Sequence, residues 1–393
     1  MARIVVCGFM VRHPVAGNLL AYFHYVLGLH RLGHEVCYVE ESGWPSSCYD
    51  PTHHIYGDDP RAGLAAVRAV MGGFGIDIPV CYVDPDRGTV EGAGWADVKR
   101  MLGAADLLLN VGGVCWLPEF RRCRRRALID MDPFFTQVGR FGAHLIGEHH
   151  VHFSYGANIG RPRCTIPTTG VAWRPTVPPV VPELWAGTDA APDAPLTTVA
   201  NWSAYGAVTY NGERFGQKDQ EFLRLLDLPK GTPQRLELAL SGAGPDVTAA
   251  LGAAGWSLRS AGEVSADVAT YRAYVHGSRG EFSVAKQAYV RTRSGWFSDR
   301  STCYLAAGRP VILQDTGFSD WLPTGHGVLG FTSLAEAVDC IERVNAEYGA
   351  HCRAARRVAA QTFDYRVVLP RLLRRALAPQ GCDPGGAAGA SPA

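Results

Sequence analysis

Short apolar runs alternate with amphipathic stretches along most of the chain. The apolar runs of the first half hold few polar positions, as in strands buried on both faces, and they predict strands at 3–7, 35–40, 80–83, 106–111 and 127–130. Between these runs the spacing of apolar residues is helical, which predicts helices at 19–32, 61–73 and 93–102. This alternation predicts an α/β layer with a mainly parallel sheet.

A second alternation follows a proline-rich middle. Residues 160–195 hold many prolines and 187–195 is rich in Gly, Asp, Ala and Pro, so this region predicts an interdomain connection, first semi-rigid and then looser. Beyond it the pattern predicts strands at 196–200, 235–239, 271–275 and 310–313, and helices at 219–226, 299–307 and 333–348. The chain is therefore divided into a domain over 1–178, a linker over 179–195, a domain over 196–365, a helix over 366–378 and a disordered tail over 379–393.

Composition narrows the class of protein. Among 393 residues, Lys and Arg number 38 and Asp and Glu 37, so the net charge of +1 argues against nucleic acid or an anionic membrane surface as a partner held by overall charge. No apolar run approaches the roughly 18 residues of a membrane span. The 11 cysteines include no Cys-x-x-Cys pair, which predicts neither a disulfide scaffold nor a zinc site and favours the reducing cytoplasm.

The first strand leads into a loop with one early glycine, Gly8, and no second one before Gly17. A dinucleotide fingerprint needs G-x-G-x-x-G at this place, so the loop does not predict NAD binding. Asn18 is expected to cap the following helix, whose N-terminus would face an anion or a polar ligand. We therefore expect Gly17 and Asn18 in the cleft.

Two segments carry a resemblance to a known family. Residues 17–21 followed by Gly-His-Glu-Val at 33–36 resemble the opening of GT-B glycosyltransferases, and residues 294–323, SGWFSDRSTCYLAAGRPVILQDTGFSDWLP, resemble their donor-nucleotide segment. The resemblance implies two Rossmann-like domains with mainly parallel sheets facing across a cleft. It also implies metal-independent transfer of a sugar from a nucleotide diphosphate sugar to a small-molecule acceptor, natural-product or carrier-bound. The acceptor would lie on the N-terminal domain and the donor on the C-terminal one, with the last helix able to cross back as in relatives.

The donor segment predicts a diphosphate site. Ser298 would cap a helix with Ser301 three residues on, so that free N–H groups and the positive end of the helix dipole face the phosphates, and Arg300 would add a bidentate fork. Arg214 and Lys218 loosely match a pair of basic residues that neutralises the leaving diphosphate in the family. The resemblance also implies that the region of Lys286 lies beside the diphosphate. Most relatives hold a ribose-binding Glu where this chain has Cys303, which leaves Asp299 or Glu281 for the ribose hydroxyls. The loop after the last strand of the segment would hold the donor sugar, through Asp315, Thr316, Gly317, Phe318 and Asp320.

The catalytic base is open between two residues. Asn18 stands where inverting relatives usually have a catalytic His, and asparagine is no general base at neutral pH, so His13 or Asp132 is expected to take that role. Asp132 follows a strand at the edge where the cleft should lie. The end of the neighbouring strand should line the cleft too, with Asn110, Gly112 and Gly113.

Other readings of the chain stay open. The histidines of 149–152 lack the spacing of a zinc motif, and neither a metal nor a cofactor is predicted. Because fold does not decide reaction, an epimerase or pseudo-glycosyltransferase remains an alternative, as does a non-catalytic nucleotide-sugar binding protein. The sequence leaves the sugar, the nucleotide base, the stereochemical outcome and the oligomeric state undetermined.

Overall fold

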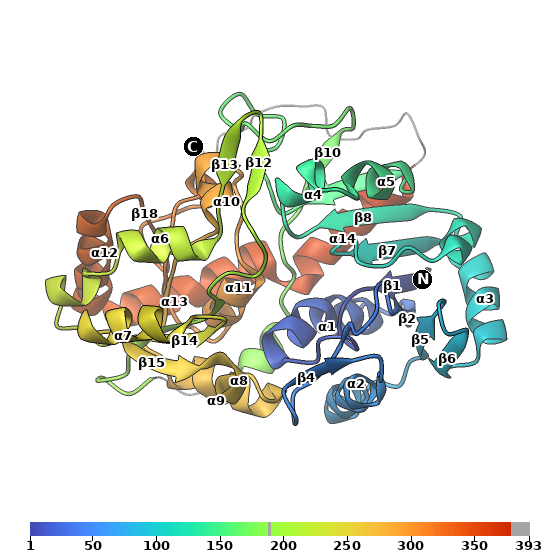
Figure 1. The fold of residues 1–393 in the computed structure, drawn as a ribbon, viewed down its shortest axis with the longest axis horizontal. Coiled ribbons are helices and arrows are strands. Elements are labelled where there is room, and N and C mark those ends of the chain that lie inside the picture. Colours follow the sequence, from blue (N-terminus) through green and yellow to red (C-terminus); the bar gives the residue numbers. More distant parts are fainter. Residues whose placement is uncertain (188–189, 379–393) are drawn as a thin grey trace.

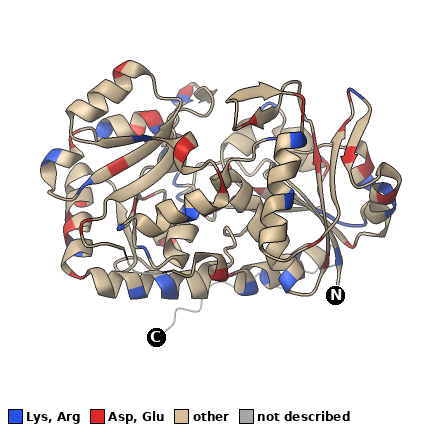
Figure 2. Cartoon of the chain, turned by 90° about the horizontal axis from the view of Figure 1, so that it is seen from below, with Lys and Arg blue, Asp and Glu red and all other residues tan. Residues whose placement is uncertain are grey.

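The computed structural model describes residues 1–187 and 190–378. Two α/β domains lie side by side, the N-terminal one on the right of Figure 1 and the C-terminal one on the left. The tail predicted over 379–393 lies outside the described residues. Charged side chains of both signs are interspersed over both domains (Figure 2), in keeping with the balanced composition.

The N-terminal domain is built on an eight-stranded sheet in the order β10-β9-β8-β7-β1-β2-β5-β6, in which only β6 runs antiparallel to its neighbour. Ile4 and Val6 of β1 belong to the core under α1, while Val5 and Cys7 point to the opposite face and α3, so both faces are covered. The strands are β1 (Arg3–Cys7), β2 (Glu35–Glu41), β5 (Val80–Asp84), β6 (Thr89–Gly92), β7 (Leu107–Val111), β8 (Arg126–Asp130), β9 (Val151–Ser154) and β10 (Trp173–Pro175). The helices are α1 (Ala16–Arg31), α2 (Arg61–Gly73), α3 (Trp95–Ala104), α4 (Phe135–Val138) and α5 (Gly142–Gly147).

A six-stranded, wholly parallel sheet forms the C-terminal domain, in the order β15-β14-β11-β16-β17-β18. Its strands are β11 (Leu196–Asn201), β14 (Leu236–Ser241), β15 (Ser257–Ser260), β16 (Gly280–Ser283), β17 (Val311–Gln314) and β18 (Val328–Phe331). The helices are α6 (Lys218–Arg224), α7 (Pro245–Ala253), α8 (Ala261–Val264), α9 (Val268–Gly277), α10 (Gln287–Arg291), α11 (Asp299–Ala306), α12 (Leu334–Ala346) and α13 (Tyr348–Val358). Two short hairpins stand apart from the sheets: β3 (Cys48–Asp50) with β4 (Ile55–Gly57), and β12 (Val208–Tyr210) with β13 (Glu213–Phe215).

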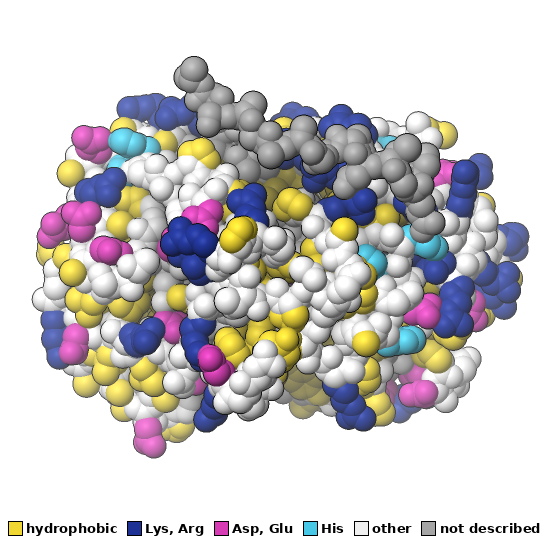
Figure 3. All heavy atoms as spheres, turned by 90° about the horizontal axis from the view of Figure 1, so that it is seen from above, with side chains coloured by type: hydrophobic (Ala, Val, Ile, Leu, Met, Phe, Trp, Pro, Cys, Tyr) yellow, Lys and Arg dark blue, Asp and Glu magenta, His cyan; other side chains and the backbone are white. Residues whose placement is uncertain are grey.

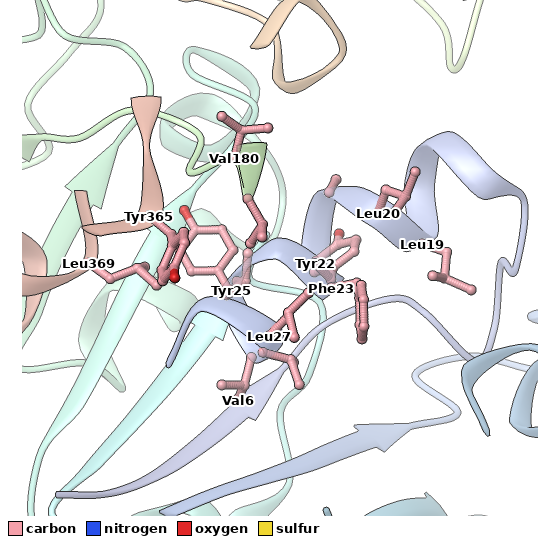
Figure 4. Close-up of a cluster of buried hydrophobic side chains, with 14 of the residues drawn as sticks. Val6, Leu19, Leu20, Tyr22, Phe23, Tyr25, Leu27, Val180, Tyr365 and Leu369 are labelled. Carbon is pink, nitrogen blue, oxygen red and sulfur yellow. The ribbon is translucent and has the colours of Figure 1, made fainter. Parts of the chain in front are cut away.

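The chain passes between the domains twice, and both passages are packed. Trp185 is fully buried, and the N–H of Val180 donates to the Phe363 carbonyl at 2.7 Å. Helix α14 (Tyr365–Leu377) then runs back over α1, so close to Gly28 that a Cβ there would lie 2.7 Å from Leu369 Cδ1. Figure 4 shows Tyr365 and Leu369 beside Tyr25 of α1, within the cluster that joins the domains.

Two local expectations were wrong. Residues 271–275 form part of helix α9, not a strand; Asp267 caps this helix by accepting from the Thr270 N–H, and Tyr271 and Val275, one turn apart, face the core. Asn18 is not the cap of α1, because that helix begins at Ala16 after Val15. The other predicted strands and helices are present, with ends shifted by a few residues.

The described residues show three further features. No helix among them has both the length and the apolar character that crossing a membrane requires. On the face drawn in Figure 3, basic, acidic and apolar side chains alternate. No cysteine within the described ranges forms a disulfide, and nearly all of these cysteines are buried.

Candidate functional site

A cavity of about 680 Å³ lies between the two domains. It opens at the carboxyl ends of β11 and β14, the place where ligands bind in parallel α/β sheets. The N-terminal domain contributes His13, Val15, Gly17, Asn18, Ala21, Tyr49, Tyr56 and Met131 to the lining. The C-terminal domain contributes Val199, Ala200, Asn201, Ser203, Ser241, Gly242, Ala261, Gly262, Ser265, Tyr271, Asp299 and Arg300.

Helix α11 begins at this cavity. Ser298 stands at the N-cap position as expected, but its side chain makes no capping hydrogen bond, and the hydroxyl of the buried Ser301 has no partner among the described residues. Asp299 opens on the cavity, beside its own N–H and that of Arg300. Burial raises the pKa of Asp299. The first turn of α11 therefore presents backbone donors and a poorly solvated carboxyl group to any occupant.

Arg300 directs its guanidinium into the protein. Nε lies 2.5 Å from Oε1 of Glu281, Nη1 donates to the Val199 carbonyl at 2.9 Å, and Nη2 donates to the Ser283 hydroxyl at 2.8 Å. Glu281 on β16 is fully buried beneath it. All three nitrogens are thus used to join α11 to two strands. A phosphate fork at Arg300 and a ribose contact at Glu281 both disagree with this geometry, because either contact would have to break a buried ion pair, which is costly.

Lys218, unlike Arg300, is not paired with a carboxylate in the described part of the chain. It is the first residue of α6 and has no hydrogen-bond or ion-pair partner among the described residues. Burial, with the like charges of Arg300 and Lys286, lowers the pKa of Lys218 to about 7. The carboxyl groups of Glu281 and Asp299 act in the opposite direction but form no ion pair with Lys218, so an anionic ligand would stabilise the charged ammonium group. Arg214, the predicted companion of Lys218, is exposed on β13, and neither Arg214 nor Lys218 is among the residues that line the cavity.

Asp132 and Lys286 form an ion pair, although they were expected to have separate roles as a catalytic base and as a residue beside the diphosphate. Lys286 Nζ lies 2.8 and 2.9 Å from the two carboxylate oxygens of Asp132, which also accept from the hydroxyls of Tyr205 and Tyr289. The ammonium lies over the rings of Phe135, Tyr205 and Tyr289, at 4.9, 4.4 and 5.3 Å from their centroids. Asp132 is so fully paired that it is a poor general base, and the cluster ties one domain to the other.

The loop predicted to hold the donor sugar is closed on itself. Asp315 accepts from the Gly317 N–H at 2.8 Å and the Ser319 hydroxyl at 2.6 Å, and Asp320 pairs with Arg293 at 3.0 Å. The Thr316 hydroxyl donates to the Trp296 carbonyl, and the apolar side chain of Phe318 is buried in the core. No residue of this loop lines the cavity.

His13 does line the cavity, at the end of a rigidly held loop. Behind it, the buried Glu40 carboxylate accepts from the N–H groups of Val11 and Arg12 at 2.9 and 2.7 Å and from Arg12 Nε at 3.2 Å. The amide of Asn18 donates to the His13 carbonyl at 2.7 Å, which is its role in place of capping. Burial lowers the pKa of His13 to about 4, so the imidazole is neutral at pH 7.

The remaining predicted cleft residues lie deeper. Asn110 is fully buried and donates to the Cys115 carbonyl at 2.8 Å. Gly112 and Gly113 take φ angles of 78° and 65°, the left-handed region that favours glycine, and a Cβ on Gly112 would lie 2.9 Å from the Tyr22 hydroxyl. These residues shape the strand end and do not line the cavity.

Sequence reasoning missed part of the lining. Asn201 and Ser241 stand at the carboxyl ends of β11 and β14, a placement that the predicted strands already indicated. Tyr49 and Tyr56 come from the β3–β4 hairpin, whose three-residue strands leave no periodic signal. No group of three or more His, Cys, Asp or Glu within the described residues is placed to hold a metal ion.

Cys303, which stands where relatives carry a ribose-binding Glu, is explained by its surroundings. Its thiol faces Nε2 of His24 on α1 at 3.9 Å, inside the contact between the domains. Cys303 is not among the residues that line the cavity.

Comparisons with known proteins agree on the architecture. No protein-family model and no curated protein matches the chain. Among solved structures it is similar to AviGT4, a glycosyltransferase involved in avilamycin A biosynthesis, at 13% identity and a TM-score of 0.57, over 96% of this chain and 98% of that one. It is also similar to HepE of Anabaena, in complex with UDP and glucose, at 12% identity and a TM-score of 0.57, over 95% and 99%.

A third similar structure is an alpha-glucosyltransferase in complex with UDP and a 13-mer DNA, at 9% identity and a TM-score of 0.57, over 95% of this chain and 99% of that one. At such identities the likeness speaks for the fold. The two mainly parallel sheets, the helix α14 that returns to the N-terminal domain and the cleft between the domains agree with this fold. The chain has the GT-B fold, with two Rossmann-like domains facing across a cleft.

Proposed function

We propose that the chain is a glycosyltransferase that moves a sugar from a nucleotide diphosphate sugar to a small-molecule acceptor without a metal ion. The observation that carries the proposal is the cavity between the domains, where the start of α11 meets the carboxyl ends of β11 and β14. Solved structures with this fold include glycosyltransferases with UDP bound. The involvement of AviGT4 in avilamycin A biosynthesis supports a natural-product acceptor.

The C-terminal wall of the cavity suits the donor nucleotide. Away from α11 its lining is neutral, with polar groups from Asn201, Ser241 and Ser265 and glycines that leave backbone atoms accessible, as a nucleoside requires. The diphosphate would lie at the first turn of α11, within the field of Lys218. Asp299, which lines the cavity, would accept from a ribose hydroxyl, because Glu281 is already paired with Arg300.

The reaction that we propose uses groups from both domains. The acceptor oxygen bonds to the anomeric carbon of the donor, the bond from that carbon to the diphosphate breaks, and the acceptor proton passes to His13. Lys218 and the N–H groups of α11 stabilise the negative charge that builds on the leaving diphosphate. Enclosure between the domains limits attack by water on the donor. We expect the reaction in the cytoplasm, where free cysteines stay reduced.

Nucleotide binding tests the donor assignment. A ligand at 100 times its dissociation constant adds about 2.7 kcal/mol to stability. We therefore expect one of a panel of nucleoside diphosphates and nucleotide sugars to raise the unfolding temperature. Lys218→Met should abolish or greatly weaken that shift, whereas Lys230→Met, at a lysine that is exposed and paired with Asp227, should leave it unchanged.

Three outcomes would count against transfer. No shift with any nucleotide would overturn the donor site. Binding without product, whatever acceptor is supplied, would favour a non-catalytic nucleotide-sugar binding protein. Recovery of an altered nucleotide sugar in the absence of acceptor would favour an epimerase.

A further inference from the structure

The β3–β4 hairpin brings two tyrosine rings to the cavity beside His13. The centroids of Tyr49 and Tyr56 lie 5.0 Å apart, and that of His13 lies 5.3 Å from Tyr49 and 6.4 Å from Tyr56, with the His13 and Tyr56 planes only 11° apart. All three side chains line the cavity. We call these three residues the aromatic wall.

The aromatic wall is held in place but left open. The Tyr49 N–H donates to the Arg12 carbonyl at 2.7 Å and the Tyr49 hydroxyl pairs with His54 Nδ1 at 2.9 Å, which anchor one strand of the hairpin. Tyr56 on the other strand stays 61% exposed. A hairpin with three-residue strands has little stability of its own, and its Tyr56 ring, which packs against Tyr49 and lines the cavity, leaves a face of the aromatic wall open to a ligand.

The N-terminal side of the cavity carries no charge at neutral pH. Its lining consists of the aromatic wall, small or apolar residues and Asn18, and the His13 imidazole is neutral. Arg12, the residue before His13, is fully buried, paired with Glu40 and stacked 4.4 Å from the Phe9 centroid. The charged groups Asp299 and Arg300 both belong to the opposite side.

A polar acceptor such as a simple sugar would find few partners here. Sugar hydroxyls need several directed donors and acceptors, and the Asn18 amide nitrogen already donates to the carbonyls of Phe9 and His13. The Tyr49 hydroxyl is engaged by His54. A flat apolar ring, in contrast, would stack on the wall and lose little hydration in doing so.

We infer that the aromatic wall of His13, Tyr49 and Tyr56 binds the acceptor of the proposed reaction, and that this acceptor is an uncharged compound with a planar apolar ring that bears a hydroxyl group. That the bound compound is the acceptor rests on the proposed function. That the aromatic wall binds such a ring does not depend on the proposed function. Each ring contact should contribute roughly 2- to 12-fold in affinity.

The test is a calorimetric titration with 2-naphthol and, as a polar probe, methyl glucoside, in the absence of nucleotide. We expect 2-naphthol to bind at least tenfold more tightly than methyl glucoside. Tyr56→Ala and Tyr49→Ala should each weaken 2-naphthol binding by roughly 2- to 12-fold, and Tyr56→Phe should retain it. Ile55→Ala is the matched control, because Ile55 is exposed on the same strand and neighbouring strand residues point to opposite faces.

Tighter binding of methyl glucoside, or equal loss in Tyr56→Ala and Ile55→Ala, would overturn the inference. Unfolding temperatures and the nucleotide response of each variant show whether the fold is intact. Because the titration uses no nucleotide, its result is separate from the donor test: nucleotide binding with no preference for the aromatic probe refutes this inference alone, and aromatic binding without any nucleotide response refutes the proposed function alone.

Discussion

The two walls of the cavity are built in different ways. The C-terminal wall consists of the ends of buried parallel strands, the first turn of α11 and residues of the α8–α9 region, and the body of α11 packs into the core that the two domains share. The N-terminal wall depends on a short hairpin outside the main sheet, with an exposed ring at its edge. A wall made from an appended hairpin can change its ligand without disturbing the fold, whereas a wall made from strand ends cannot. This contrast suits an enzyme with a fixed kind of donor and a particular acceptor.

Two cations beside α11 show the same contrast on a smaller scale. Arg300 is paired with the buried Glu281. Lys218 lies close enough to Arg300 for the charge of Arg300 to lower its pKa, but it has no partner among the described residues. A paired cation supports the fold, and an unpaired one is available to a ligand.

The largest expected effect is the loss of activity when His13, the proposed catalytic base in the N-terminal wall, is replaced. His13→Gln should lower kcat by roughly 10²- to 10⁴-fold, the usual contribution of general base catalysis, with nucleotide affinity unchanged. Since the pKa of His13 is about 4, the wild-type rate should be flat around neutrality and fall as the pH drops through about 4, where the imidazole gains a proton. Release of nucleoside diphosphate measures both, and His53→Gln on the exposed hairpin is the control. An unchanged rate in His13→Gln would remove His13 from the chemistry.

Next in size is the loss of the buried pair in the C-terminal wall. Arg300→Ala leaves the fully buried Glu281 carboxylate without its partner, which should cost about 3–5 kcal/mol of unfolding free energy. Arg291→Ala, which removes an exposed pair with Glu213, should cost less than about 1 kcal/mol. Denaturant unfolding gives both values. Equal stability of the two variants would contradict a structural role for Arg300.

A smaller effect is expected where the walls are tied together. Lys286→Met removes the cation from the Asp132 carboxylate at the domain contact and should cost about 1–3 kcal/mol, since the pair is only partly exposed. Arg293→Met breaks a pair within the C-terminal domain and serves as the comparison, with a loss below about 1 kcal/mol. Urea unfolding compares the two. If Lys286→Met were as stable as wild type, the cluster would not hold the domains together.

The smallest effect is a pH dependence of donor binding. With the pKa of Lys218 near 7 in the free protein, anion binding requires proton uptake above that pH, so nucleotide-sugar affinity should fall as pH rises, by at most about tenfold per pH unit. Phosphates of a nucleotide sugar keep their charge in this range, and Lys218→Met should flatten the profile. An affinity that rose with pH in the wild type would contradict the assignment.

The sequence foretold most of the fold because buried parallel strands are nearly unbroken apolar runs. It failed at residues 271–275, where Tyr, Val and Ala suit either a strand or a helix and the cap at Asp267 decided for the helix. The site was harder to foresee. Asp132 and Lys286 are 154 residues apart, and their pairing depends on how one domain sits against the other. Arg300 and Glu281 satisfy each other through β16 and α11, a contact that motif spacing does not record.

The central claim is that each wall binds its own ligand. The direct measurement is a crossed titration: nucleotide and 2-naphthol, each against the wild type, Lys218→Met and Tyr56→Ala. We predict that Lys218→Met loses nucleotide affinity and keeps 2-naphthol affinity, and that Tyr56→Ala does the reverse. Loss of both ligands in either correctly folded variant, or of neither ligand in both, would contradict the division of the cavity into a donor wall and an acceptor wall.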